Sequence, residues 1–196
     1  MSSPEGPPRL GLLHRGFDRL YPAIRFTYER FRGHIWFSHV TPSLWLGGAP
    51  TYGRDYDALL DLGITAVVDM RAERVADAAF YDRHGIAHRQ YHVPDVTVPD
   101  EEVLTDAVDW MAARIHEGRV VLIHCAKGRG RSATVLAAYL MDEEGMTFDQ
   151  VDELLSRKRP LVKLQERHRE VLESWIAKRP AASPSGTPDS SPQAAP

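Results

Sequence analysis

One stretch near the middle of the chain, RVVLIHCAKGRGRSATVLAAYLMDEEG over residues 119–145, most limits the folds available to it. Residues 119–125 form a short apolar run rich in β-branched side chains, which is typical of a strand in the middle of a sheet. A glycine-containing loop follows, and residues 132–145 predict a helix that is buried on most sides. A buried strand that leads directly into a buried helix predicts the centre of an α/β domain.

The rest of the chain alternates strand and helix signals in the same way. Strands or extended segments are predicted over residues 38–46, 64–70, 86–94 and 119–125, and helices over 55–63, 75–85, 100–118, 132–145, 147–159 and 164–178. Asp100 follows a proline at the start of the longest helix, and Thr147 with Gln150 forms a capping-box signal. The pair Gly47–Gly48 is expected to form a turn after the first strand. The predicted fold class is α/β, with a mostly parallel central sheet flanked by helices on both faces.

Composition divides the 196-residue chain into one globular domain and its flanking segments. Residues 1–9 are expected to be disordered, and residues 10–34 to form an amphipathic helical arm with apolar side chains at helical spacing. The other face of the arm is cationic, since residues 9–34 hold six arginines and two acids. Residues 35–179 are expected to form the domain. The Pro, Ala and Ser-rich segment 180–196 is expected to be a disordered tail, because it cannot bury enough apolar surface to offset its ordering entropy.

Charge and cysteine content indicate where such a protein works. The single cysteine excludes an internal disulfide and favours a reducing compartment. The N-terminal sequence MSSPEGPPRL lacks the apolar region of a secretory signal, and no stretch has the apolar length of a transmembrane helix. We therefore expect a cytoplasmic protein that can lie peripherally on an anionic membrane through its arm. The net charge of −3 gives no indication of nucleic acid, which is not a predicted partner.

The chain's one cysteine, Cys125, lies between the predicted central strand and the following helix. Backbone N–H groups at a helix start lack internal partners, and the helix dipole adds partial positive charge there. Glycines can turn further N–H groups inward, and Arg131 can hold two phosphate oxygens in a bidentate fork. The same field lowers the pKa of a thiol from its usual value of about 8.5. The alternative, a small core cysteine in an ordinary strand-to-helix turn, would not explain the arginine and glycines together.

The sequence HCAKGRGRS, residues 124–132, resembles the His-Cys-x5-Arg-Ser/Thr signature of the cysteine-dependent protein tyrosine phosphatase superfamily, in its compact dual-specificity branch. The resemblance covers about residues 21–175. The segment LYPAIRFTYERFRGHIWFSHVTPSLWLGGAP is similar to the start of the mitochondrial tyrosine-phosphatase-like phosphatidylglycerophosphate phosphatases. The resemblance implies a dual-specificity phosphatase-like fold, with residues 35–179 as the phosphatase domain. It also implies hydrolysis of phosphate monoesters through a phosphocysteine intermediate, with no cofactor and no metal.

The resemblance also assigns roles to the residues of this loop. Cys125 would attack phosphorus, and Arg131 would bind and orient the phosphoryl oxygens. Ser132 would stabilise the departing thiolate, and His124 would order the loop by hydrogen bonding and support the lowered thiol pKa. The substrate phosphate would lie in the cradle formed by Ala126, Lys127, Gly128, Arg129 and Gly130.

An alkoxide leaving group needs a proton, so the mechanism needs a carboxylic acid near the loop. Asp95 follows an extended segment at the position from which the family supplies its acid. Asp100 is the alternative, although it is expected to cap the helix that it precedes. Asp69 and Arg71, at the end of a predicted strand, are expected to form a structural ion pair at the rim of the site.

Lys127 and Arg129 bear on the choice of substrate. Additional cations suit a substrate with more than one negative charge, such as phosphatidylglycerophosphate or a phosphoinositide. Arg129 matches the lipid-phosphatase pattern, whereas the position after the cysteine, usually basic, is Ala126, and the charge has moved to Lys127. The expected partner is a phosphorylated lipid or, as the alternative, a phosphoprotein. An inactive phosphate-binding module and a rhodanese-like sulfurtransferase are the remaining alternatives.

Two further groups of polar residues are candidates for a functional site. Gln165 and His168 compete for a polar position that the family often fills near its last helix. His84, His88 and His92 recur every fourth residue, but nearby glycine and proline make the stretch a poor helix. On a strand the three histidines would spread too far apart to share one ion, so no metal site is predicted.

Overall fold

The computed structural model of the chain describes Arg25 and residues 36–179. The predictions for residues 1–9, for the other residues of the arm 10–34 and for the tail 180–196 lie outside the described residues. The strands are β1 (Phe37–Thr41), β2 (Leu44–Gly48), β3 (Ala66–Asp69), β4 (Ala87–Gln90) and β5 (Val121–Cys125). The helices are α2 (Gly53–Asp61), α3 (Ala78–Arg83), α4 (Glu101–His116), α5 (Arg131–Glu143), α6 (Phe148–Lys158) and α7 (Glu166–Lys178).

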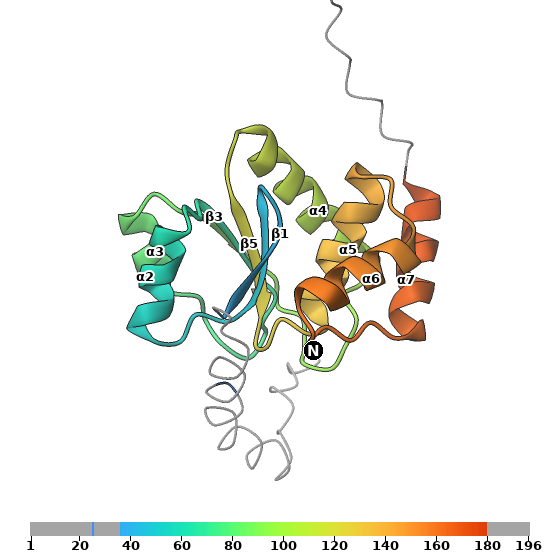
Figure 1. The fold of residues 1–196 in the computed structure, drawn as a ribbon, viewed down its shortest axis with the longest axis horizontal. Coiled ribbons are helices and arrows are strands. Elements are labelled where there is room, and N and C mark those ends of the chain that lie inside the picture. Colours follow the sequence, from blue (N-terminus) through green and yellow to red (C-terminus); the bar gives the residue numbers. More distant parts are fainter. Residues whose placement is uncertain (1–24, 26–35, 180–196) are drawn as a thin grey trace, which may run out of the picture.

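The strands form a single sheet in the order β1-β2-β5-β3-β4. β1 and β2 form an antiparallel hairpin, and all other neighbours pair in parallel. Helices α2 and α3 lie on one side of the sheet, and α4 to α7 lie on the other (Figure 1). The predicted α/β class, with a mostly parallel sheet covered on both faces, is confirmed. The predicted central strand is β5, which pairs with β2 and β3.

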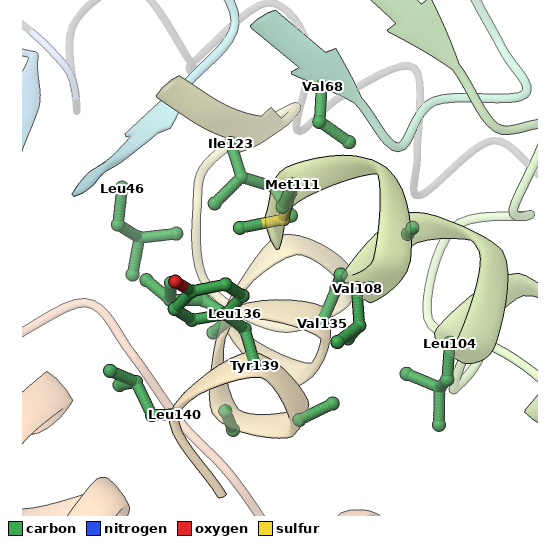
Figure 2. Close-up of a cluster of buried hydrophobic side chains, with 14 of the residues drawn as sticks. Leu46, Val68, Leu104, Val108, Met111, Ile123, Val135, Leu136, Tyr139 and Leu140 are labelled. Atoms are coloured by element: carbon green, nitrogen blue, oxygen red, sulfur yellow. The ribbon is translucent and has the colours of Figure 1, made fainter. Parts of the chain in front are cut away.

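Alternation along the strands divides the interior into two apolar cores. Val67 of β3 and Leu122 of β5 point to the side of α2 and α3, where they join the smaller core. Val68 and Ile123, one residue further along each strand, belong to the larger core beneath α4 and α5. Figure 2 shows Ile123 beside Met111 of α4 and the side chains of α5. Both faces of β5 are therefore buried, which explains its continuous apolar sequence.

The first hairpin differs from the prediction at its glycines. Gly47 and Gly48 do not form a turn but are the last two residues of β2, where they pair with His124 and Cys125. A Cβ atom on Gly47 would lie 2.5 Å from Cδ1 of Phe37, and one on Gly48 would lie 2.1 Å from Cζ2 of Trp36. The glycines are needed because aromatic side chains cross the strand at these positions.

The helix boundaries follow the capping signals in the sequence. The Asp100 carboxylate accepts a hydrogen bond from the Val103 amide at 2.9 Å and begins α4. Thr147 and Gln150 form the predicted capping box at the start of α6. The helix predicted over 75–85 is shorter and begins at Ala78, since the side chain of Asp77 caps it. Among the described helices, none is both long and apolar enough to cross a membrane.

Arg25, from the predicted arm, is buried against the domain. Its guanidinium makes a bidentate ion pair with Asp55 of α2 and lies over the ring of Trp36, with 4.5 Å between Cζ and the ring centroid. Burial raises the pKa of Asp55, but the bond from Arg25 and the backbone bonds from Thr51 and Tyr52 together outweigh burial, and the net pKa lies below its ordinary value. This cation therefore serves the fold, and it does not contribute to a solvent-facing cationic surface as the sequence suggested.

Candidate active site

The predicted loop connects a fully buried strand to a helix that is buried along most of its length. Cys125 is the last residue of β5 and Arg131 is the first residue of α5, so the five residues between them lead into a helix N-terminus. The thiol is almost fully buried. Its Sγ accepts hydrogen bonds from the Gly128 amide and from the Ser132 hydroxyl, each at 3.3 Å. The sulfur thus occupies the centre of a ring of donors.

This environment favours the thiolate. Burial by itself raises the pKa of Cys125, because it penalises the charged sulfur. The positive charge of Arg131 and hydrogen bonds from Ser132 and the Arg129 amide act in the opposite direction and prevail. The net pKa of the thiol is below its ordinary value. A lowered pKa is what a cysteine nucleophile needs near neutral pH.

A buried arginine, Arg159, holds the loop from its outer side. It follows α6 and is 0 % exposed. Its Nε donates to the carbonyl of Gly128 at 3.0 Å, and Nη2 donates to the carbonyl of Lys127 at 2.7 Å. Nη1 donates to the carbonyl of Trp36 at 3.1 Å. With their carbonyls bound outward, the neighbouring peptides turn their N–H groups toward the sulfur. In the sequence, this role has no signal beyond a basic residue before a proline.

The glycines of the loop and of β2 permit this close packing. Gly128 has a φ of 63°, which favours glycine. A Cβ atom on Gly128 would also lie 2.3 Å from the carbonyl oxygen of Gly47. The loop therefore rests directly on the backbone at the end of β2, and a side chain at Gly128 would push it away.

Arg131 is held in place by acceptors from two other loops. Its Nη1 and Nη2 each donate to Glu73 at 2.8 Å, and Nη1 also donates to the carbonyl of Val93 at 2.9 Å. Burial disfavours the charge on Arg131, but the bond to Glu73 and the negative charges of Cys125, Glu73 and Asp95 together outweigh burial and raise the pKa of the guanidinium. The role of Glu73 could not be predicted from the sequence, because Glu73 lies in a loop without a motif, 58 residues before Arg131.

The structure separates the two candidate acids. Asp95 lies with Oδ1 at 3.0 Å from Nη2 of Arg131, and its side chain is 39 % exposed. Asp100 is occupied as the cap of α4. Val96, next to Asp95, has a φ of 65° and is well exposed. Asp95 is thus presented to the site by a strained, solvent-exposed turn.

His124 does not make the hydrogen bonds expected of it. Neither ring nitrogen has a hydrogen-bond partner among the described residues, and Nδ1 lies 3.7 Å from Oδ1 of Asp69. Burial lowers the pKa of His124 to about 4, against the attraction of Asp69, so its ring is neutral at neutral pH. Asp69 forms the expected ion pair with Arg71, with 2.7 Å between Oδ2 and Nη2. The neutral ring of His124 is thus buried beside this pair.

A cavity of about 280 Å³ opens above Cys125. It is lined by residues 95–97, by residues 125–127 and 129–131 of the loop, and by Lys163, Gln165, Arg167 and His168. Both candidates for the polar position near the last helix, Gln165 and His168, therefore reach it. Lys163 and Arg167 were not singled out in the sequence.

The histidines 84, 88 and 92 lie apart from this cavity and make separate contacts. His84 packs on Phe80 with 4.5 Å between ring centroids, and His88 packs on Tyr81 with 5.3 Å. Within residues 36–179 and Arg25, no three His, Cys, Asp or Glu side chains are grouped so that they could hold a metal ion. The arrangement above Cys125 instead combines a thiolate, a bidentate cation and a carboxyl group, which suits displacement at a phosphate.

Comparison with known proteins gives one consistent result. The sequence model of the family described as "Polymorphic toxin system, DSP-PTPase phosphatase" matches residues 47–145. Phosphatidylglycerophosphate phosphatase PTPMT2 of Arabidopsis thaliana is 28% identical over 160 residues, which cover 80% of this chain and 68% of that protein. Dual specificity protein phosphatase 12 of Rattus norvegicus is 35% identical over 133 residues, which cover 65% of this chain but only 37% of that protein. The crystal structure of Tk-PTP in the active form superimposes with a TM-score of 0.67 and 27% identity, covering 74% of this chain and 98% of that one.

Proposed function

Because the chain belongs to the dual-specificity branch of the cysteine-dependent phosphatases, we propose that it hydrolyses phosphate monoesters with Cys125 as nucleophile. The observation that carries this proposal is the sulfur itself, which receives hydrogen bonds from Gly128 and Ser132 beside the guanidinium of Arg131. A thiolate and a phosphate receptor are thereby brought to one point. No cofactor is needed for this chemistry.

In the first step, the thiolate of Cys125 attacks phosphorus and the bond to the ester oxygen breaks. Arg131 binds two phosphoryl oxygens, one of which replaces Asp95 at Nη2. Asp95, in its protonated form, gives its proton to the departing alkoxide. The loop amides bind the remaining charge as it develops on the equatorial oxygens. The products are a phosphocysteine and an alcohol.

In the second step, water attacks the phosphocysteine and the S–P bond breaks. The Asp95 carboxylate accepts a proton from the water, which restores its protonated form. The sulfur leaves as a thiolate, and the hydrogen bond from Ser132, 3.3 Å away, stabilises it. Inorganic phosphate is released, and the enzyme returns to its starting state.

We further propose that the substrate is an anionic phospholipid, such as phosphatidylglycerophosphate or a phosphoinositide. The name of the Arabidopsis relative states the first of these activities for that protein. In this chain, cationic residues line the cavity from the loop and from the start of α7, and no Phe, Tyr or Trp of the described residues lines it. A phosphotyrosine ring would lack an aromatic partner there, whereas a polyol phosphate would not need one.

A panel of substrates tests both the proposed phosphatase activity and the proposed phospholipid substrate. Phosphate release is measured from vesicles containing phosphatidylglycerophosphate or a phosphoinositide, and from peptides carrying phosphotyrosine or phosphoserine, with Cys125→Ser as the blank. We expect Cys125-dependent release, with the highest kcat/KM on a lipid. Faster release from a peptide would make the chain a protein phosphatase. No Cys125-dependent release from any member would make it an inactive phosphate-binding module.

The predicted arm bears on where the enzyme finds such a substrate. We propose that residues 10–34 bring the enzyme to an anionic membrane surface, on the basis of their apolar spacing and arginine content. Arg25 is excluded from that role by its burial against Asp55. Sedimentation with vesicles, with and without anionic lipid, tests the proposal, and binding to neither would contradict it.

A further inference from the structure

A second group of cations lines the cavity from outside the phosphate loop, residues 125–131. Lys163 lies in the connection between α6 and α7, and Arg167 lies in the first turn of α7. Both line the cavity above Cys125. Together with Lys127, Arg129 and Arg131 they make five cationic side chains, and among the described residues that line it Asp95 is the one carboxylate. The phosphate that is cleaved is held by Arg131 and the loop amides, so Lys163 and Arg167 are not needed to hold it.

The backbone fixes both residues relative to the site. The Lys163 amide donates to the carbonyl of Arg129 at 3.1 Å, so this connection is joined directly to the phosphate loop. Arg167 donates from Nη1 to the carbonyl of Val96 at 3.2 Å, which holds its guanidinium next to the turn that carries Asp95. The two cations are therefore placed at the cavity before any ligand arrives.

Their charges are not compensated by the protein. Within the described part of the chain, neither Lys163 nor Arg167 forms a salt bridge. The hydrogen bond that Arg167 donates to the Val96 carbonyl involves a neutral acceptor. Arg169, on the same helix, provides the contrast, since it lies within 4 Å of the carboxylates of Asp149, Glu166 and Glu173. Cations that face a cavity without carboxylate partners are suited to a ligand anion.

We propose that Lys163 and Arg167 form a second anion subsite, which binds another phosphate group of the same substrate while Cys125 and Arg131 hold the phosphate that is cleaved. This inference rests on the proposed phosphatase function and narrows it. The substrate class is a small polyol that carries two phosphate groups, of which the second can be a monoester or a diester to a lipid. The subsite lies outside the phosphate loop, so it can select substrates without changing the residues that cleave the phosphate ester.

Glycerol 1,3-bisphosphate and glycerol 3-phosphate test this proposal, because both lose phosphate from a primary alcohol and only one carries a second phosphate. We expect the wild-type kcat/KM to favour the bisphosphate by about tenfold, which corresponds to two exposed ion pairs. The preference should fall toward about two, the statistical factor for the two equivalent phosphates of the bisphosphate, in Lys163→Gln, in Arg167→Gln and in the double variant. Lys158→Gln removes an exposed cation that does not line the cavity, and it should keep the wild-type preference.

The outcomes separate this inference from the function on which it rests. A wild-type preference no greater than the statistical factor, with Cys125-dependent release, would overturn the subsite and leave the phosphatase in place. The subsite would also be overturned if the double variant kept the preference for the bisphosphate, or if Lys158→Gln lowered that preference as much as the double variant does. A preference for a peptide carrying two phosphates over the bisphosphate would assign the cations to a protein substrate and also overturn the proposal. Absence of Cys125-dependent release from every substrate would overturn the function itself.

Discussion

The carboxylate of Asp95 lies 3.0 Å from Nη2 of Arg131, at a donor that a phosphoryl oxygen has to use. Glu73 occupies the other side of the same guanidinium through both terminal nitrogens. Glu73 therefore fixes the orientation of Arg131, and Asp95 makes the contact that substrate must replace. In the proposed mechanism, Asp95 then gives its proton to the leaving oxygen.

This arrangement predicts how Asp95→Asn depends on the leaving group. On an alkyl phosphate, kcat should fall by about 10²–10⁴-fold, because the alkoxide no longer receives a proton. On an activated aryl phosphate, whose leaving group needs no proton, the loss should be much smaller. Steady-state kinetics with the two substrates measure the difference. Asp100→Asn is the matched control, since Asn caps a helix as well as Asp does and α4 should be unchanged. Equal losses on both substrates in Asp95→Asn would remove Asp95 from the role of acid.

At the scale of elements, the phosphate loop depends on contacts from the other end of the chain. Arg159 joins the loop carbonyls to the carbonyl of Trp36, so the end of α6, the start of β1 and the loop are bound by one guanidinium. Removing the guanidinium would leave buried carbonyls without donors, and each unsatisfied carbonyl would lower the free energy of unfolding by about 1–3 kcal/mol. It would also release the peptides whose N–H groups face Cys125.

Arg159→Met should therefore raise the pKa of the Cys125 thiol as well as lower stability. The pH midpoint of alkylation by iodoacetamide measures the thiol, and a shift upward with a loss of kcat of about 10-fold or more is expected. Loss of stability without a change in this midpoint would mean that Arg159 only supports packing. Arg157→Met, two residues earlier at an exposed position of α6, should leave the midpoint unchanged, and Arg159→Lys should restore part of it.

The elements that could be predicted from the sequence are those whose signals are local. β5 and α5 carry continuous apolar patterns, and Asp100 and Thr147 carry capping patterns, so these elements were placed correctly. The contacts of Glu73 and Arg159 could not be predicted, because each joins the site across tens of residues and shows no local motif. The sequence predicts a turn at the glycines of β2 for the same reason. These glycines make room for Phe37 and Trp36, a contact that only the folded structure shows.

For the whole molecule, the order of the strands explains why these distant residues meet. β5 lies between β2 and β3, so its carboxyl end is flanked by the end of β2 and by the loop that follows β3. Ligands bind outside this edge in open α/β sheets. Glu73 comes from the loop after β3, and Asp95 from the segment after β4, so neighbouring strands deliver both carboxylates to Arg131. Burying the site so deeply in the sheet has a consequence for stability, because His124 is buried with it.

His124 predicts a pH dependence of global unfolding. Its pKa in the folded protein is about 4, below the unfolded value of about 6.5, so only the unfolded chain takes up a proton between these values. Stability should be fully present above pH 6.5 and fall as the pH approaches 4, by on the order of 3 kcal/mol for the complete shift. Urea unfolding at several pH values from 7 to 4.5 measures this loss. The range stays above the region where Glu73 and Asp55, whose pKa values are lowered, add their own losses.

His124→Asn should remove most of this pH dependence whatever it does to stability at pH 7, because asparagine does not titrate. A smaller slope should remain, since burial also lowers the pKa of His168. His116→Asn, at an exposed position on α4, should keep the wild-type slope. Thermal shift alone would not suffice, because both variants can change stability without changing its slope. The full slope retained in His124→Asn would show that another group takes up the proton on unfolding. The neutral imidazole beside the Asp69–Arg71 pair would then not be the source of acid sensitivity in this fold.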